Sequence, residues 1–299
     1  MMRSKCWLAG AMVLGMALQA AATEGGGGAY PNGAEGFMTG ALPPPGQYIV
    51  NYSTYYSAES FKGGDGHTAG MPMDFDLHVF ADTVRFINVT DVDVLGGQWA
   101  QQIFVPIVWM DVKYTTFSQT KDKNFGLGDI IVDPFVVGWH KPPFHWVVGL
   151  DTYVPTGKYD DESAANLGRN YWTFEPVAGV TYLNEGGQEV SAKLMYDFNT
   201  ENEQTEYISG QEFHTDFVAA QHCGNWAAGL GGYWYHQTTN DRQGGEQVAG
   251  GNQGRQLALG PQVSYQCCKV NFSLAWDREL ASKNRPQGDK IWLKAVLPL

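Results

Sequence analysis

Seven histidines are the residues best able to bind a metal ion or act as a general base, but they are scattered along the chain. They lie at His67, His78, His140, His145, His214, His222 and His236. Metal sites with paired histidines usually show H-x-H or H-E-x-x-H spacing, and neither occurs here. The chain also lacks a G-x-S-x-G nucleophile motif and a glycine-rich loop for phosphate. We therefore predict no catalytic residues, no bound metal and no cofactor.

Charged residues occur instead at every second position, between apolar ones. In the stretch 171–200, Glu175 faces away from the apolar series that runs from Trp172 to Tyr182. After Asn184-Glu185-Gly186-Gly187 the alternation resumes, with Lys193 and Asp197 opposite a second apolar series, Val190 to Phe198. Successive side chains of a strand point to opposite faces, so this stretch is a hairpin with one apolar and one charged face. The same pattern places Asp129 and Asp133, then Asp151, then Asp277 on polar faces of other strands.

The apolar face of such a strand points either into a soluble core or toward lipid, and the connections decide between the two. Twelve strands are predicted, at about 47–58, 74–90, 98–114, 128–139, 144–155, 172–182, 190–198, 211–222, 226–238, 256–266, 269–278 and 290–297. Connections are long after odd strands and short after even ones, without exception. Outer-membrane barrels have an even number of antiparallel strands, short periplasmic turns and long outer loops. The prediction is an all-β, antiparallel transmembrane β-barrel.

The N-terminal region predicts export. A basic start, an apolar run from Trp7 to Leu18 and the A-x-A site at Ala20–Ala22 indicate a signal peptide at 1–22, cleaved after Ala22. Residues 23–45 are rich in glycine and proline and predict a flexible segment, which is also a candidate plug for the lumen. The barrel domain is then 46–299. No later stretch reaches the ~20 apolar residues of a membrane-spanning helix. Localisation in the outer membrane of a Gram-negative cell, in contact with its lipid, follows.

Composition and cysteines narrow the partners. The net charge is −12 and there is no basic run, so we expect no nucleic-acid partner. Three cysteines remain after cleavage, and an odd count in an oxidising compartment leaves at least one thiol unpaired in the monomer. Cys223 and the pair Cys267-Cys268 end two neighbouring hairpins at their short turns. A disulfide between Cys223 and Cys267 or Cys268 is therefore one alternative. The sequence does not specify an oligomeric state.

Several linked motifs resemble a known family. They include Gly126-Leu-Gly-Asp129, Val154-Pro-Thr-Gly-Lys-Tyr-Asp160, Asn166-Leu-Gly-Arg-Asn-Tyr-Trp-Thr-Phe-Glu-Pro176, Tyr196-Asp-Phe-Asn199 and Leu259-Gly-Pro-Gln-Val263. Together they are similar to the family named for the meta-pathway of phenol degradation, over about residue 40 to the end. Members of that family are regarded as outer-membrane β-barrels with a transport role, encoded near aromatic-degradation functions. The resemblance implies uptake of hydrophobic or aromatic compounds.

Three functions remain open at this point. The first is passive uptake of small hydrophobic or aromatic molecules, through a constricted polar lumen or by lateral escape into the membrane. The second is a barrel-embedded enzyme acting on lipids or aromatics, and the third is a closed structural barrel. With the apolar faces toward lipid, the charged faces line the lumen. Their charges then either form a salt-bridge network that holds the barrel shut or line a permeation path that sets selectivity. The candidate lumen residues are Asp129, Asp133, Asp151, Glu175, Lys193, Asp197 and Asp277.

Overall fold

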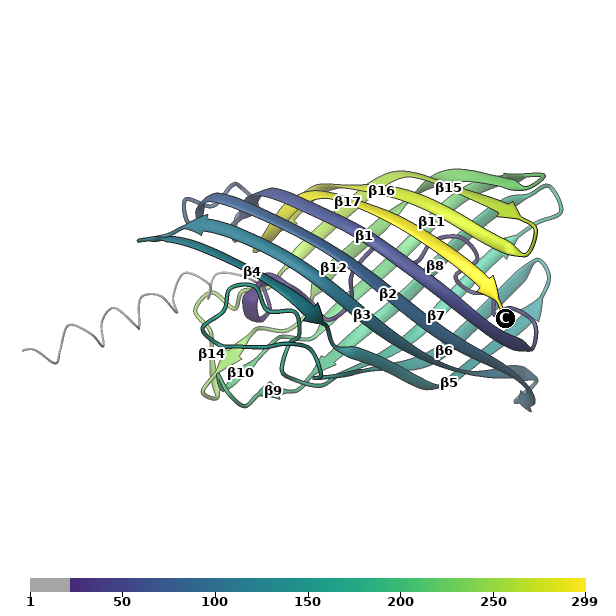
Figure 1. Cartoon of the computed structure of the whole chain (residues 1–299), viewed down its shortest axis with the longest axis horizontal. Helices are drawn as coiled ribbons and strands as arrows, with labels where there is room; N and C mark the ends of the chain where they lie inside the picture. The colour runs from purple at the N-terminus through teal and green to yellow at the C-terminus, as the bar shows by residue number, and fades with distance from the viewer. Residues whose placement is uncertain (1–21) are drawn as a thin grey trace, which may run out of the picture.

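The computed structural model describes residues 22–299, which form a closed barrel of twelve antiparallel strands (Figure 1). Each strand pairs with its neighbours in sequence, and β1 pairs with β17 to close the sheet. Residues 1–21, which contain most of the predicted signal peptide, lie outside the described part of the chain. Within that part, no helix is long and apolar enough to cross a membrane.

The predicted strand count is confirmed, and most strand ends agree to within a few residues. The barrel strands are β1 (Gly46–Lys62), β2 (Met73–Val94), β3 (Gly97–Thr115), β5 (Ile130–Lys141), β6 (Phe144–Val154), β7 (Thr173–Leu183), β8 (Gln188–Asn199), β11 (Glu212–Cys223), β12 (Trp226–Gln237), β15 (Arg255–Cys267), β16 (Val270–Lys283) and β17 (Arg285–Pro298).

Two connections at the loop end differ from the prediction. The polar stretch after β3 forms a further strand, β4 (Gln119–Leu127), which pairs with the end of β3. The predicted loop 279–289 is instead the continuation of β16 and β17, which meet at a turn on Asn284. The expectation of a long connection after every odd strand is therefore wrong at this last hairpin. Hairpins that project beyond the membrane are solvated, so their strands carry polar residues and read as loops in the sequence.

The remaining long connections gather at the same end of the barrel. They carry a small four-stranded sheet built from β9 (Glu201–Asn202), β10 (Tyr207–Ile208), β13 (Arg242–Gln243) and β14 (Glu246–Gln247). Figure 1 shows these strands beside β4, at the end opposite the C-terminus. In outer-membrane barrels the long loops are extracellular and the short turns periplasmic, so the loop end is the outer end and the short-turn end, where the C-terminus lies, is periplasmic.

The two faces of the wall follow the alternation seen in the sequence. On β7, Glu175 and Val177 are buried inside the barrel, whereas Phe174 and Val180 each expose 40% of their surface on the outside. Most of the outer face is apolar, as a surface in contact with lipid requires, and Asp82 of β2 is paired there with Asn51 of β1. Aromatic rings cluster near both strand ends on this face, including Trp139 stacked on Trp146. They suit the two membrane interfaces.

Candidate functional site

The N-terminal segment fills much of the lumen. It begins at the outer end, where the Glu24 N–H donates to the Ser209 hydroxyl at 3.1 Å, and it reaches β1 at the periplasmic end. On the way, Met38 N–H donates to Glu189 and Gly40 N–H donates to Thr181 of the wall. A Cβ on Gly40 would fall 2.4 Å from a backbone atom of Thr181, so only glycine allows this approach. The stretch predicted to be flexible is thus held along its length by hydrogen bonds to the wall.

The outer start of this segment is tied to the loops through Glu24. Its carboxylate accepts hydrogen bonds from Tyr159 (3.1 Å), Asn202 (2.8 Å) and Thr205 (2.7 Å). Burial, followed by the Glu24 charge, raises the pKa of Tyr159 to about 12, so its hydroxyl remains a neutral donor at physiological pH. A short 3₁₀ turn, η1 (Glu24–Gly26), therefore links two outer connections to the segment inside the barrel.

Glu35 is the central anchor of the segment. Its carboxylate lies 3.1 Å from Arg85 Nη1 of β2 and 2.6 Å from Lys294 Nζ of β17, and it accepts a hydrogen bond from Tyr52 of β1 at 2.9 Å. Nearby, Asp216 of β11 accepts from the Tyr30 hydroxyl at 2.6 Å and from the Gly33 N–H at 2.8 Å. The segment is fastened to opposite sides of the wall at one level by charge-assisted bonds, which are the stronger kind.

Three of the predicted lumen residues form a charged network with Lys193. Lys193 Nζ lies 3.3 Å from Asp151 Oδ2 and 4.0 Å from Glu175 Oε1, and both carboxylates are almost fully buried. Gln102 of β3 extends the network, donating to Asp133 at 3.4 Å and to Asp151 at 3.3 Å. The ammonium group also lies over the Tyr30 ring, 4.9 Å from its centroid. The network therefore joins the wall to the N-terminal segment.

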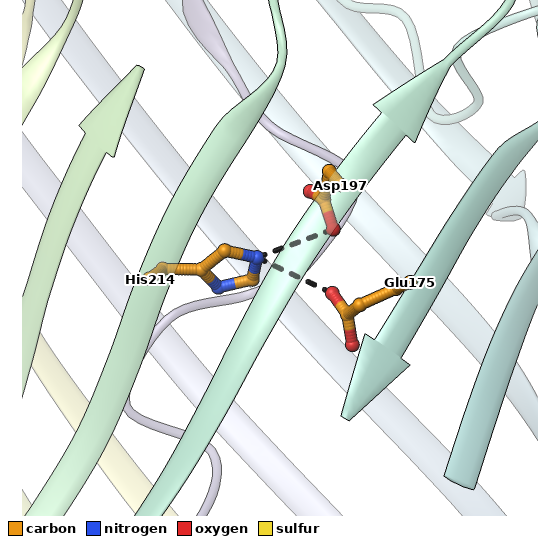
Figure 2. A group of neighbouring side chains, drawn as sticks. All are labelled: Glu175, Asp197 and His214. Atoms are coloured by element: carbon orange, nitrogen blue, oxygen red, sulfur yellow. Dashed lines mark ion pairs between the residues drawn. The ribbon is translucent and has the colours of Figure 1, made fainter. Parts of the chain in front are cut away.

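Asp197 belongs to a second group beside this network. His214 Nε2 of β11 lies 3.2 Å from Asp197 Oδ1 of β8 and 3.3 Å from Glu175 Oε2 of β7. Figure 2 shows the imidazole pointing between the two carboxylates, which come from two neighbouring strands. All three side chains are at most 1% exposed. These residues present one nitrogen and two carboxylate groups to one point in the wall, which is a donor set able to hold a metal ion.

The other two predicted residues lie apart from these groups. Asp277 of β16 is fully buried on the inner wall, in register with Lys290 of β17. Asp129 lies in the two-residue break between β4 and β5 and accepts from the Gly157 and Arg169 N–H groups of the outer loop 155–172. Asp129 therefore holds that loop against the wall, rather than standing on a strand as predicted.

Beside the outer part of the N-terminal segment, the lumen contains a cavity of about 520 Å³ that reaches the outer loops. Its wall on β2 and β3 is apolar, because the inner faces of these strands carry hydrophobic residues in their outer halves: Phe75, Leu77, Val79, Val108, Met110 and Val112. Ala164 and Ala165 of the loop 155–172 pack over the Val112 end as an apolar cover. Its floor is polar and includes Glu35, Asp151 and Lys193.

The cysteines lie at the periplasmic turns, as expected from their positions. Cys223, Cys267 and Cys268 are exposed and unpaired in the structure. Their two turns are neighbours, since the Gln266 N–H donates to the Asn225 carbonyl at 2.8 Å. A disulfide between Cys223 and either of the others stays a prediction.

The barrel is similar to solved outer-membrane structures. A COG4313 outer membrane channel from Pseudomonas putida F1 superposes with a TM-score of 0.75 at 16% identity, covering 88% of this chain and 98% of that one. The β domain of the Bordetella autotransporter BrkA (TM-score 0.45, 10% identity, 85% and 99% covered) and a Pseudomonas aeruginosa FadL homologue (0.41, 9%, 84% and 89%) superpose too weakly to support an argument. No curated protein matches the chain.

The family model described as "Putative MetA-pathway of phenol degradation" matches residues 58–295. The chain belongs to this family. The protein is thus an outer-membrane β-barrel, as both the fold and the family indicate.

The sequence did not predict several residues that the structure places in the lumen. Glu35 lies in a stretch with no strand period, and its partners Arg85 and Lys294 were not singled out. His214 shares the parity of Glu212 and Asp216 on one strand, so the alternation alone places it on the inner face. What the sequence lacks is the register that brings His214 to Asp197 and Glu175.

Proposed function

We propose that this protein is a passive channel for small hydrophobic or aromatic compounds in the outer membrane of a Gram-negative cell, exported by a cleaved signal peptide. The observation that carries the proposal is the cavity with an apolar wall at the outer end of the lumen. A volume of about 520 Å³ lies within the range of small-molecule sites, about 300–1,000 Å³. Burial of apolar surface there, at about 25 cal/mol per Å², supplies the driving force for capture from water.

The N-terminal segment obstructs the direct route of a captured molecule through the lumen. Straight passage down the lumen meets the Glu35 and Lys193 networks, where an apolar molecule would displace charge-assisted bonds. The wall beside the cavity is weaker. The strand breaks at Gly128-Asp129, and the ladder between β5 and β6 is interrupted from Val132 to Val137. Lateral escape into the membrane through this side is the route we favour.

The lumen charges therefore act as a closure in this proposal. Lys193, Asp151 and Glu175 are paired with one another and nearly inaccessible, so they hold the wall and the N-terminal segment together. A permeation path for ions or polar solutes would need those charges to be solvated. We propose that the protein conducts few ions, while hydrophobic molecules cross it.

The proposal is a channel and not an enzyme or a closed barrel. Measurement of toluene uptake by cells distinguishes these three alternatives. Cells that express the protein should accumulate labelled toluene faster than cells without it, and mass spectrometry should recover toluene unchanged. Ala81→Trp fills the cavity wall and should abolish the gain. Ala178→Trp, on the lipid face of β7, is the matched control and should retain it. Equal uptake with and without the protein would refute the channel, and a modified product would favour the enzyme.

A further inference from the structure

Two acidic residues face each other across neighbouring strands inside the barrel. The pairing Thr173↔Asn199 and Val177↔Met195 places Glu175 of β7 opposite Asp197 of β8. Both carboxylates have no exposed surface. Like charges directly opposite each other destabilise a sheet, and a buried carboxylate without a partner is costly. The wall therefore needs a positive charge between these two groups.

His214 supplies a ligand atom at that point but no ordinary hydrogen bond. It lies opposite Met195 on β11, one diagonal step from Asp197, and its Nε2 approaches both carboxylates at 3.2–3.3 Å. Neither nitrogen of His214 and neither carboxylate oxygen of Asp197 has a hydrogen-bond partner, although all four atoms are buried. The Nε2 and Oδ1 atoms lie at ion-pair distance from each other, whereas His214 Nδ1 and Asp197 Oδ2 have neither a hydrogen bond nor an ion pair. Buried polar atoms are nearly always paired, so this cluster indicates an unaccounted partner.

We propose that Glu175, Asp197 and His214 bind a divalent transition-metal ion, with Zn²⁺ the best match. Around a tetrahedral Zn²⁺ with ligands at about 2.0–2.1 Å, neighbouring ligand atoms lie about 3.3 Å apart. The His214 nitrogen stands at that separation from one oxygen of each carboxylate. Imidazole suits Zn²⁺, whereas Ca²⁺ and Mg²⁺ take all-oxygen sites with more ligands.

The local charge supports a dication. Lys193, the nearest base, lies closer to Asp151 (3.3 Å) than to Glu175 (4.0 Å), so it is shared with a third carboxylate. A protonated His214 would balance one of the two facing carboxylates, whereas a divalent ion bound to neutral His214 balances both. Tyr153 donates to Glu175 Oε2 at 3.3 Å and would orient that ligand.

The bound ion would join three adjacent strands at the level of the N-terminal segment. β7, β8 and β11 each supply one ligand, and the Tyr30 ring lies against His214 with centroids 5.0 Å apart. Because the ligands converge only in the folded barrel, binding would stabilise it against unfolding. The site is set apart from the apolar cavity, whose lining includes none of the three ligands.

Metal titration of the full refolded chain tests the proposal. After chelator treatment and dialysis, Zn²⁺ added alone should bind at one equivalent and raise the temperature at which the folded band is lost in heat-modified gels. Co²⁺ at the same site should show the intense visible absorption of tetrahedral coordination. Mg²⁺ should produce neither effect.

Near-isosteric variants identify the ligands. Asp197→Asn, Glu175→Gln and His214→Gln should each lower Zn²⁺ affinity at least tenfold and abolish the thermal shift, in protein whose gel mobility shows a folded barrel. His236→Gln, on the outer face of β12, is the control and should bind as the wild type does. No Zn²⁺ bound by the wild type, or full binding by any folded ligand variant, would overturn the proposal. The wild-type result stands even if a variant fails to fold.

Discussion

Glu35→Gln is the substitution that should most affect the N-terminal segment. The carboxylate lies between Arg85 and Lys294, and the three side chains are only 10%, 16% and 16% exposed. Removal of the negative charge leaves two poorly solvated cations close together on the same side of the wall, where β2 and β17 flank β1. Loss of one partner of a buried ion pair costs about 3–5 kcal/mol. Because the strand ladders of the wall do not involve Glu35, we expect the cost to favour release of the segment rather than loss of the barrel.

Hydrogen exchange measures that release directly. The Gly33 and Glu35 N–H groups donate to the Asp216 carboxylate at 2.8 and 3.1 Å, so they should be protected in the wild type. A cost of about 3 kcal/mol predicts exchange at these amides about a hundredfold faster in Glu35→Gln, since each 1.4 kcal/mol is tenfold in population. Glu185→Gln, in an exposed periplasmic turn, is the charge-matched control and should leave exchange unchanged. Equal protection in both variants would refute the anchoring role of Glu35.

Three other perturbations test separate parts of the barrel. Lys193→Met leaves Asp151 without its cation and should lower stability by about 3 kcal/mol, seen as earlier loss of the folded band in heat-modified gels. Gly128→Leu places a side chain where even a Cβ meets Pro106 at 3.2 Å, and it should slow toluene uptake without unfolding the barrel. Burial raises the pKa of the loop residue Asp241 to about 6. Its contribution to loop stability is thus present below its ordinary pKa near 4 and lost as pH rises through 6. After division by the intrinsic exchange rate at each pH, loop amides should therefore be less protected at pH 7 than at pH 4, and Asp241→Asn should remove that difference in protection.

Most strands of the wall were predictable because each is amphipathic by itself. The alternation around Glu175 and Lys193 specifies which residues face inward, and the twelve-strand count follows from repetition of that pattern along the chain. The outermost parts were not predictable in the same way. Strand β4 and the outer ends of β16 and β17 carry mostly polar residues on both faces, so no apolar series marks them as strands.

The contents of the lumen depend on contacts between distant parts of the chain. Glu35 contacts Lys294 only because closure of the barrel brings β17 beside β1. The sequence around each residue contains no pattern that predicts this contact. The apolar cavity likewise depends on the outer halves of β2 and β3, which carry hydrophobic residues on their inner as well as their outer face. A strand with two hydrophobic faces is typical of a buried strand, so its sequence does not indicate the wall of a binding cavity. His214 needed the strand register, which spacing along the chain does not contain.

The most direct test of the central claim is to locate a hydrophobic ligand in the protein. Crystals soaked with iodobenzene would place the iodine atom by its anomalous signal. Our account predicts an iodine peak in the cavity inside the barrel, against Val79 and Val108 and beside the N-terminal segment. This peak should be lost in Ala81→Trp. Iodine found only on the lipid-facing surface, with no peak in the cavity, would contradict the account.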